Sequence, residues 1–103
     1  MSLSTHVLDA SAGRPAAGVA VRLEGPAGVI AEGRTDADGR LSGWRPGAGP
    51  HRLVFGTGAY FAGRGVDTFY PEVTIGFTVG DPDEHYHVPL LLSPYAYSTY
   101  RGS

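Results

Sequence analysis

The sequence predicts an all-β fold made of short strands. Glycine (16) and proline (8) together supply nearly a quarter of the 103 residues, and they separate short apolar segments instead of forming a low-complexity tract. Several of these segments alternate apolar with polar side chains, which is the period of a half-buried strand. Only residues 58–63 have a helical character, and it is weak. The length corresponds to one domain, residues 1–103, without a linker or a repeat.

Eight strands are expected, and turn-forming residues mark the breaks between them. In chain order the strands cover residues 3–8, 19–23, 29–35, 40–44, 51–55, 73–79, 86–92 and 95–101. The first ends at Asp9 and a Ser-Ala-Gly-Arg-Pro turn, and the second alternates Val and Leu with Ala and Arg. The third leads into the tight Asp-Ala-Asp-Gly turn at residues 36–39. A loop from Pro46 to Pro50 and a Gly-Asp-Pro-Asp turn at residues 80–83 separate later strands.

Composition argues against several classes of function. The chain has no cysteine, which excludes a disulfide framework and a thiol nucleophile. Its eight cationic residues other than histidine are all Arg, scattered and balanced by acids at a net charge of -2, so we expect no nucleic-acid surface. No apolar stretch is long enough to span a membrane, and residues 1–6 lack the features of a secretory signal. We therefore expect a cytoplasmic protein that binds neither nucleic acid nor membrane.

Residues 88–92 are apolar on both faces of their expected strand. A strand in a two-sheet antiparallel fold normally has one apolar and one solvated face. The second face therefore needs a cover, and a chain of this length has little left to supply one. Because exposed apolar strips mark interfaces, we expect a homo-oligomer. Pro89 lacks a donor for the ladder and should lie at an edge or a bulge.

Histidine is the side chain that titrates near neutrality, and it is the first candidate for chemistry here. The four histidines are His6, His51, His85 and His87. Strand alternation places His85 and His87 on one face. If the first strand lies beside the late hairpin, then His6, His87 and Tyr100 converge. We expect His51 at the surface, because it follows a Gly-Pro turn, and His85 as a solvent-facing neighbour.

Four blocks of the sequence resemble the 5-hydroxyisourate hydrolases. They are Thr5-His6-Val7-Leu8-Asp9, Thr35-Asp36-Ala37-Asp38-Gly39-Arg40, Tyr86-His87-Val88-Pro89-Leu90-Leu91-Leu92-Ser93-Pro94, and the ending Tyr100-Arg101-Gly102-Ser103. The resemblance runs essentially from end to end. A single block would be a weak signal, whereas four in order, one of them at the C-terminus, are specific.

The resemblance implies a transthyretin-like sandwich of two four-stranded antiparallel sheets with one short helix. It also implies a homotetramer of two dimers, with active sites in the channel at the dimer–dimer interface. The family's catalytic residues fall on His6, Arg40 and His87. Its terminal tetrapeptide, which would bind substrate, falls on Tyr100, Arg101, Gly102 and Ser103. No metal and no cofactor is implied.

The implied activity is hydrolysis of 5-hydroxyisourate, a cyclic amide of urate breakdown, to 2-oxo-4-hydroxy-4-carboxy-5-ureidoimidazoline. Opening a cyclic amide needs a base for water, a stabiliser for the oxyanion and a proton for the leaving nitrogen. An imidazole of His6 or His87 can accept a proton at neutral pH, and the guanidinium of Arg40 suits an oxygen-rich substrate. Which histidine is base and which is acid stays open. No Gly-x-Ser-x-Gly elbow of a serine hydrolase accompanies them.

Three other interpretations compete with this one. Transthyretin itself resembles the chain at residues 7–9 and 91–94 but lacks the His-Arg-His set, so a small-molecule carrier without catalysis is the main alternative. A small β-sandwich interaction module is the second. In the third, His6, His85 and His87 bind zinc, although the charge of Arg40 would repel the cation. Without the resemblance, Arg40 would be read as a strand-opening residue paired with an aspartate of the preceding turn, an exposed contact that contributes little.

Overall fold

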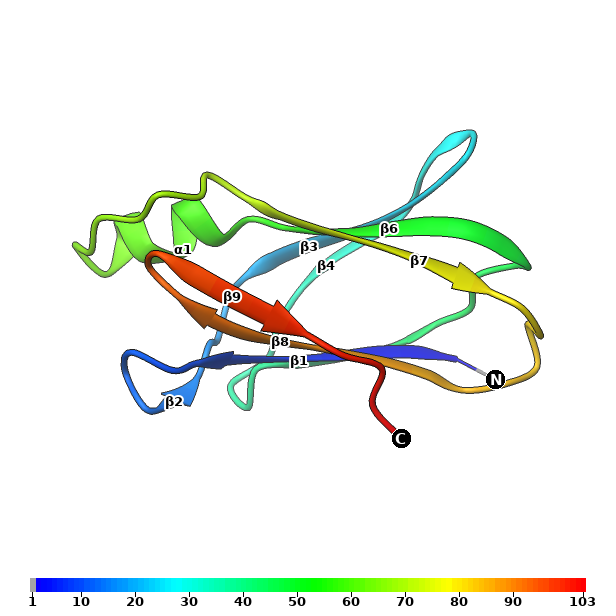
Figure 1. Ribbon diagram of the computed structural model, residues 1–103, viewed down its shortest axis with the longest axis horizontal. Helices are drawn as coiled ribbons and strands as arrows, with labels where there is room; N and C mark the ends of the chain where they lie inside the picture. Colours follow the sequence, from blue (N-terminus) through cyan, green and yellow to red (C-terminus); the bar gives the residue numbers. More distant parts are fainter. Residues whose placement is uncertain (1) are drawn as a thin grey trace.

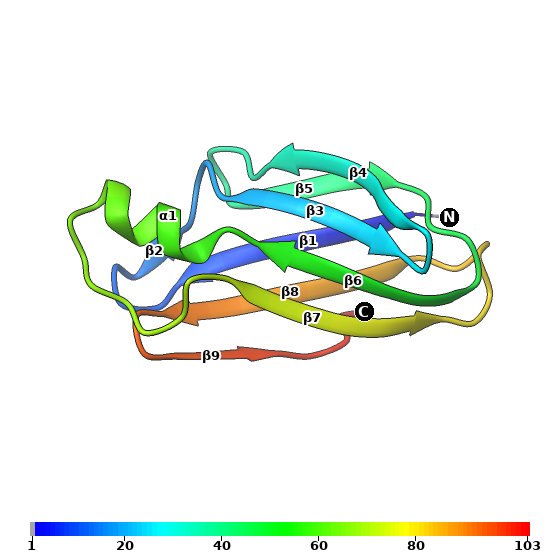
Figure 2. The same cartoon turned by 90° about the horizontal axis from the view of Figure 1, so that it is seen from above.

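Two β-sheets face each other across an apolar core in the computed structural model, which describes residues 2–103 (Figure 1). The elements are β1 (Leu3–Asp9), β2 (Arg14–Pro15), β3 (Ala20–Gly25), β4 (Gly28–Arg34), β5 (Arg40–Trp44), β6 (Gly49–Phe55), α1 (Thr57–Gly63), β7 (Val73–Val79), β8 (Tyr86–Ser93) and β9 (Ala96–Thr99). In Figure 2, α1 lies at one end of the sandwich and the start of β1 at the other. Within residues 2–103, no helix has the length and apolar character that crossing a membrane requires.

The two sheets differ in how their strands pair. The back sheet has the order β4-β3-β6-β7 and is antiparallel throughout. The front sheet has the order β2-β1-β8-β9, and β5 also pairs with β1. Within it, β1 and β8 run parallel. The predicted two-sheet sandwich with one short helix is confirmed, but four antiparallel strands in each sheet describe only the back sheet. No hairpin constrains β1 and β8, because the whole back sheet lies between them in the chain.

Alternation along β1 separates the core from the outward face of the front sheet. Leu3, Thr5, Val7 and Asp9 are buried, while the residues between them are half-buried. The buried hydroxyl of Thr5 donates to the carbonyl oxygen of Val88 on β8, at 2.6 Å, so it is satisfied inside the core. The even-numbered positions of β1 therefore present their side chains on the outer surface of the sandwich.

Most strand boundaries follow the sequence pattern closely, and the exceptions have structural causes. Residues 40–44 and 73–79 form strands as predicted. The last strand covers only Ala96–Thr99 and ends before residue 101, because the chain beyond it turns to pair residue 102 with β8. Pro89 lies between that pairing and the last β8–β9 pair, where its carbonyl oxygen accepts from the Thr99 hydroxyl. It sits at an interruption of the ladder, as its missing donor requires.

The prediction that His51 lies at the surface is wrong. Its side chain is only 6% exposed, its Nδ1–H donates to the carbonyl oxygen of Gly49, and its ring stacks on Phe77. The strand begins at Gly49, two residues before the expected start. Residue 51 is therefore inside the strand and not in a turn, and alternation puts it on the buried row of β6 with Leu53 and Phe55, at the margin of the core.

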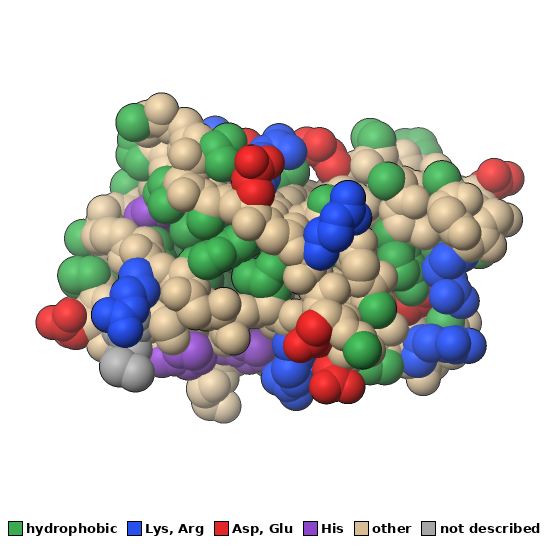
Figure 3. Space-filling view, turned by 180° about the vertical axis from the view of Figure 1, so that it is seen from behind, with side chains coloured by type: hydrophobic (Ala, Val, Ile, Leu, Met, Phe, Trp, Pro, Cys, Tyr) green, Lys and Arg blue, Asp and Glu red, His purple; other side chains and the backbone are tan. Residues whose placement is uncertain are grey.

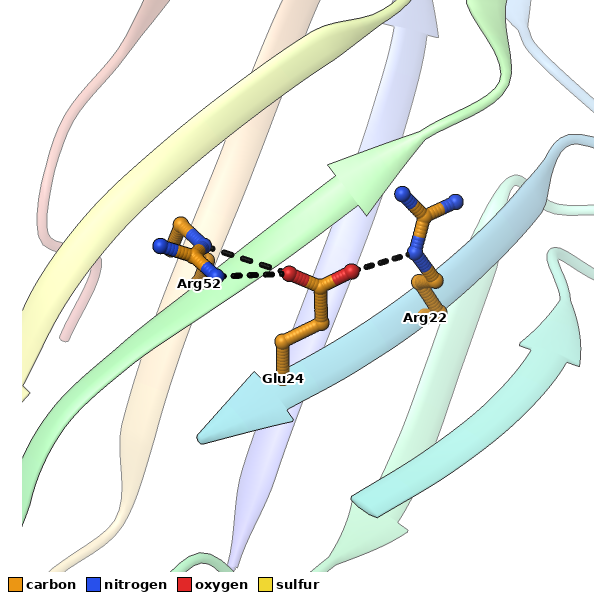
Figure 4. A network of polar contacts seen from close by, with 3 residues as sticks. All are labelled: Arg22, Glu24 and Arg52. Carbon is orange, nitrogen blue, oxygen red and sulfur yellow. Dashed lines mark hydrogen bonds and ion pairs between the residues drawn. The ribbon is translucent and has the colours of Figure 1, made fainter. Parts of the chain in front are cut away.

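The outward face of the back sheet carries a closed group of ion pairs (Figure 4). The carboxylate of Glu24 accepts from Nε of Arg22 through one oxygen. Its other oxygen accepts from Nε and Nη2 of Arg52, at 3.2 and 3.0 Å. The hydrogen bond from Arg22, followed by that from Arg52, lowers the pKa of Glu24. Each charge in this group therefore has a partner of the opposite sign.

Candidate active site

Three adjacent strands of the front sheet bring the sequence-predicted residues His6, Arg40 and His87 together. In the register of the sheet, His6 of β1 lies directly opposite Arg40 of β5. His87 of β8 lies opposite Ser4, two residues before His6 on the same face of β1. Directly opposed residues have Cβ atoms about 5 Å apart and diagonal neighbours about 7–8 Å. Arg40 is therefore the direct neighbour of His6 and His87 its diagonal neighbour, and the three side chains form one staggered row across the sheet. The condition under which the sequence analysis expected these residues to converge is met, because β1 pairs with β8.

The histidines are visible together at the surface. In Figure 3, histidine side chains lie side by side along the lower edge of the molecule, next to a basic side chain. Arg40 is exposed, and His6 and His87 are half-buried. The row is therefore accessible from outside the sandwich.

The Asp-Ala-Asp-Gly turn positions both His6 and Arg40. Gly39 has φ +75°, and a Cβ atom there would overlap the carbonyl oxygen of Val7. Glycine therefore lets the turn approach β1, where the amide of Val7 donates to the carbonyl oxygen of Gly39 at 2.7 Å. The same approach brings Nε2 of His6 to 2.9 Å from the carbonyl oxygen of Asp38. Because a carbonyl only accepts, Nε2 carries the hydrogen, and Nδ1 of a neutral His6 is left as the acceptor.

Arg40 is not paired with the aspartates that precede it. Oδ1 of Asp36 accepts from the backbone amides of Asp38 and Arg40, both at 2.9 Å. These bonds stabilise the turn through the backbone of Arg40 and do not involve its guanidinium. With the residues that the structure describes, the Arg40 side chain forms neither an ion pair nor a hydrogen bond. Its charge is therefore available to a ligand on the outward face.

His87 is held in its neutral form. Burial is the main cause that lowers its pKa below 6.5, and the positive charges of Arg40, His85 and His6 add to it. Its Nδ1 lies 2.8 Å from Oγ of Ser4. Nε2 has no hydrogen-bond partner among residues 2–103, so it is the nitrogen left for a ligand.

The C-terminal tetrapeptide lies next to His87. The amide of Gly102 donates to the carbonyl oxygen of His87 at 2.8 Å, and a Cβ atom on Gly102 would overlap Cδ2 of the His87 ring. Gly102 therefore packs directly on that imidazole. Arg101 lines a pocket together with His87 and Tyr100, and its guanidinium lies 4.7 Å from the centre of the Tyr86 ring and pairs with Glu84 at 3.1 Å. Tyr100 and Ser103 are exposed.

Sequence reasoning missed two serines. Oγ of Ser4 lies 3.1 Å from Nε2 of His85 as well as 2.8 Å from Nδ1 of His87. Oγ of Ser2 lies 3.1 Å from Nδ1 of His85. The signal was the alternation that places residues 2, 4 and 6 on one face, but a strand serine alone does not point to a site. Among residues 2–103 no group of three potential ligands is arranged to hold a metal, so the geometry gives the zinc alternative no support.

Comparisons with known proteins identify the relatives of the chain. The model of the HIUase/Transthyretin family matches residues 3–102. The 5-hydroxyisourate hydrolase of Salmonella typhimurium is 47% identical over 98% of this chain and 80% of its own length. The enzyme of that name from Caulobacter vibrioides is 47% identical, over 98% and 97%. The one from Mus musculus is 43% identical, over 98% and 94%.

Solved structures extend the likeness to three dimensions. The 5-hydroxyisourate hydrolase of Klebsiella pneumoniae superimposes with a TM-score of 0.90 at 40% identity, covering 99% of this chain and 93% of that one. A sea bream transthyretin in complex with thyroxine gives 0.85 at 33% identity, covering 97% and 93%. The matched residues span nearly the whole sequence, and the chain belongs to the HIUase/Transthyretin family.

Proposed function

We propose that this chain hydrolyses 5-hydroxyisourate to 2-oxo-4-hydroxy-4-carboxy-5-ureidoimidazoline. The observation that carries the proposal is the row of His6, Arg40 and His87 on one outward face, where the guanidinium has no acidic partner among the described residues. Relatives named 5-hydroxyisourate hydrolase at 43% and 47% identity over 98% of the chain support the choice of substrate.

The tautomer of His6 supports a division of roles between the two histidines. His6 carries its hydrogen on Nε2, toward the carbonyl of Asp38, so Nδ1 is the base that takes a proton from water. The water oxygen bonds to the ring carbonyl carbon, and Arg40 stabilises the oxyanion that forms. The ring C–N bond then breaks, and the leaving nitrogen takes a proton from Nε2 of His87. Both histidines return to their starting state by exchange with solvent, and the products are a carboxylate and a ureido group.

A homotetramer with its active sites at the dimer–dimer interface completes the proposal. The row lies on an open face of a single chain, and the neighbouring Leu91 is 37% exposed. A second copy over this face would exclude water from the row and strengthen the electrostatic interaction of Arg40 with a bound substrate. In this assembly, Tyr100 to Ser103 close the site. Light scattering after size exclusion should give the mass of four chains, and a monomer would contradict this part. A cytoplasmic location remains a prediction.

The carrier alternative is favoured by the likeness to a transthyretin in complex with thyroxine. It does not explain why two titratable side chains and an unpaired cation share one face, since a carrier needs no proton transfer. A carrier would bind an aromatic small molecule and leave the decay of 5-hydroxyisourate at its spontaneous rate.

One assay separates these functions. Urate oxidase generates 5-hydroxyisourate in the cuvette, and its ultraviolet absorbance is followed with and without the protein. We expect decay much faster than the spontaneous rate in the presence of the protein. Decay at the spontaneous rate would remove the hydrolase.

A further inference from the structure

A continuous chain of two hydroxyls and two imidazoles leads from the solvent to the proposed active site. Its first contact joins Oγ of Ser2 to Nδ1 of His85, at 3.1 Å. The second joins Nε2 of His85 to Oγ of Ser4, at 3.1 Å, and the third joins Oγ of Ser4 to Nδ1 of His87, at 2.8 Å. The parallel register of β1 and β8, which sets Ser4 opposite His87, places this serine between the two rings.

The number of available hydrogens restricts how this series of hydrogen bonds can be arranged. Each hydroxyl has one hydrogen and each neutral imidazole has one N–H, so all three hydrogen bonds must point the same way. If they point toward the site, Ser4 donates to Nδ1 of His87, and the N–H of His87 is on Nε2. If they point away, His87 donates from Nδ1 to Ser4, Ser4 donates to His85, and Nε2 of His87 is a bare acceptor.

We propose that Ser4 is a positioning residue for the hydrolysis, and that Ser4 and His85 form a proton relay that lets His87 act as donor and acceptor in turn. When Nε2 gives its proton to the leaving nitrogen, the hydrogen of Ser4 moves to Nδ1 of His87. The hydrogen on Nε2 of His85 then moves to Ser4, and Nδ1 of His85 takes one from Ser2 or water. The ring of His87 stays neutral before and after, and no charge is left on the relay.

The surroundings of His87 favour this mechanism. Arg40 on β5, His6 on β1 and His85 on β8 all face it and disfavour a second proton on its ring, as burial does. A neutral ring is the form that has two tautomers, whereas an imidazolium can only donate. Gly102 packs against the ring carbon Cδ2. It therefore blocks neither Nδ1, which contacts Ser4, nor Nε2, which is left for a ligand. His85 is exposed, so the outer end of the relay can exchange with water.

This inference rests on the proposed hydrolase, so kcat is the first readout. We expect Ser4→Ala to lower kcat about tenfold or more with little change in KM, and Ser4→Thr, which keeps the hydroxyl, to restore it. Ser42→Ala is the matched control, because Ser42 is exposed and lies opposite Ser4 on β5. It should retain the wild-type kcat. The oligomeric state and the unfolding midpoint of each variant are measured, so that a loss of assembly or stability is not mistaken for a loss of kcat.

Rates in mixtures of light and heavy water distinguish a relay from a merely structural serine. The dependence of kcat on the deuterium fraction should be curved for the wild type, because several protons move together, and linear for Ser4→Ala. A curved dependence in Ser4→Ala, or failure of Ser4→Thr to restore kcat, would overturn the relay. If Ser4→Ala does not assemble, His85→Phe breaks the same chain, and a curved dependence there would also overturn it.

A spectroscopic measurement tests the relay independently of turnover. The ¹⁵N chemical shifts of the imidazole report which nitrogen of His87 carries the hydrogen. We expect Ser4→Ala to change the balance between the two tautomers and Ser42→Ala to leave it unchanged. If the wild-type protein proves inactive, the proposed function fails, but the relay is still judged here: an unchanged tautomer balance in Ser4→Ala would reject it.

Discussion

The outward faces of the two sheets both carry arginine, yet they differ in what surrounds it. On the back sheet, Arg22 and Arg52 share the carboxylate of Glu24. On the front sheet, Arg40 has no acidic partner within residues 2–103. Its neighbours across the strands are the imidazoles of His6 and His87, and the pKa of His87 is lowered by burial first and by the nearby positive charges second. The two faces thus place the same residue type in opposite electrostatic settings.

The difference indicates which of the two faces can still bind a charged ligand. An exposed ion pair that is already closed contributes little to stability and has little attraction left for a ligand. An unpaired guanidinium beside two imidazoles gains no ion pair within the fold, so its charge is available to an oxygen-rich substrate. We therefore expect substitutions on the front sheet to change activity and substitutions on the back sheet to change little.

The largest effect should come from the matched pair Arg40→Ala and Arg52→Ala. Loss of the unpaired guanidinium removes the stabiliser of the oxyanion, so kcat/KM should fall about 10²–10³-fold. Arg52→Ala removes an equal charge from the back sheet and should leave kcat/KM within about twofold. His6→Ala and His87→Ala should each lower it about 10²–10⁴-fold. Equal activity of the two arginine variants would abolish the proposed distinction between the faces.

A smaller loss is expected when the support of His87 is disturbed from the C-terminal side. In Gly102→Ala, the new methyl group would overlap Cδ2 of His87, so the ring or the C-terminal segment must move. We expect kcat/KM to fall about tenfold, since the proton donor is displaced. Gly47→Ala is the control, because a Cβ there meets nothing within 4 Å. A fully active Gly102→Ala would show that this contact is not needed.

Much of the fold could be predicted from the sequence, because hydrophobic alternation and Gly, Pro and Asp breaks mark strands directly. The direction of β1 relative to β8 could not, since strand pairing between residues so far apart leaves no local pattern. His51 illustrates a local failure: a Gly-Pro pair suggested a turn, but the strand already begins at Gly49.

The candidate site was only partly within reach of the sequence. His6, Arg40 and His87 were indicated by the family resemblance, whereas the place of Arg40 after the Asp-Gly turn suggested only an ion pair with an aspartate of that turn. Ser4 was invisible, because a serine in a half-exposed strand is ordinary and only the register opposite His87 gives it meaning. Arg101 was expected to bind substrate; it lines a pocket with His87 and Tyr100, and its contacts with the Tyr86 ring and Glu84 had no signal in the sequence.

The titration of His87 also tests the comparison between the two faces, with a smaller expected effect. Its pKa is lowered in the folded protein, first by burial and then by Arg40, so its ring signals should titrate below pH 6.5. Arg40→Ala should move this titration upward, whereas Arg52→Ala should not. NMR of the histidine ring protons measures both. A titration unmoved by Arg40→Ala would contradict the proximity of the two groups.

The same shift has a consequence for stability. Between the lowered pKa of His87 in the folded protein and its higher value in the unfolded chain, the unfolded chain binds more protons. The free energy of unfolding therefore rises with pH through that window and falls as the solution is acidified. Urea unfolding of the wild type and of His87→Gln across this range should show a weaker dependence in the variant. An identical dependence in the two proteins would mean that His87 does not contribute to the change of stability with pH.

The smallest effect is expected for Glu24→Gln on the back sheet. It removes the charge that Arg22 and Arg52 share, and because the network is exposed to solvent we expect only a slight decrease in the urea midpoint. The activity should not change. A clear loss of turnover would show that the two faces are coupled.

The most direct test of the front face as the active site is an NMR titration with urate, a stable planar relative of the substrate. Urate should shift the ring signals of His6 and His87 and the guanidinium signal of Arg40, and leave those of Arg22, Arg52 and His51 in place. Shifts confined to the back sheet, or none at the front-sheet residues at saturating urate, would contradict the account.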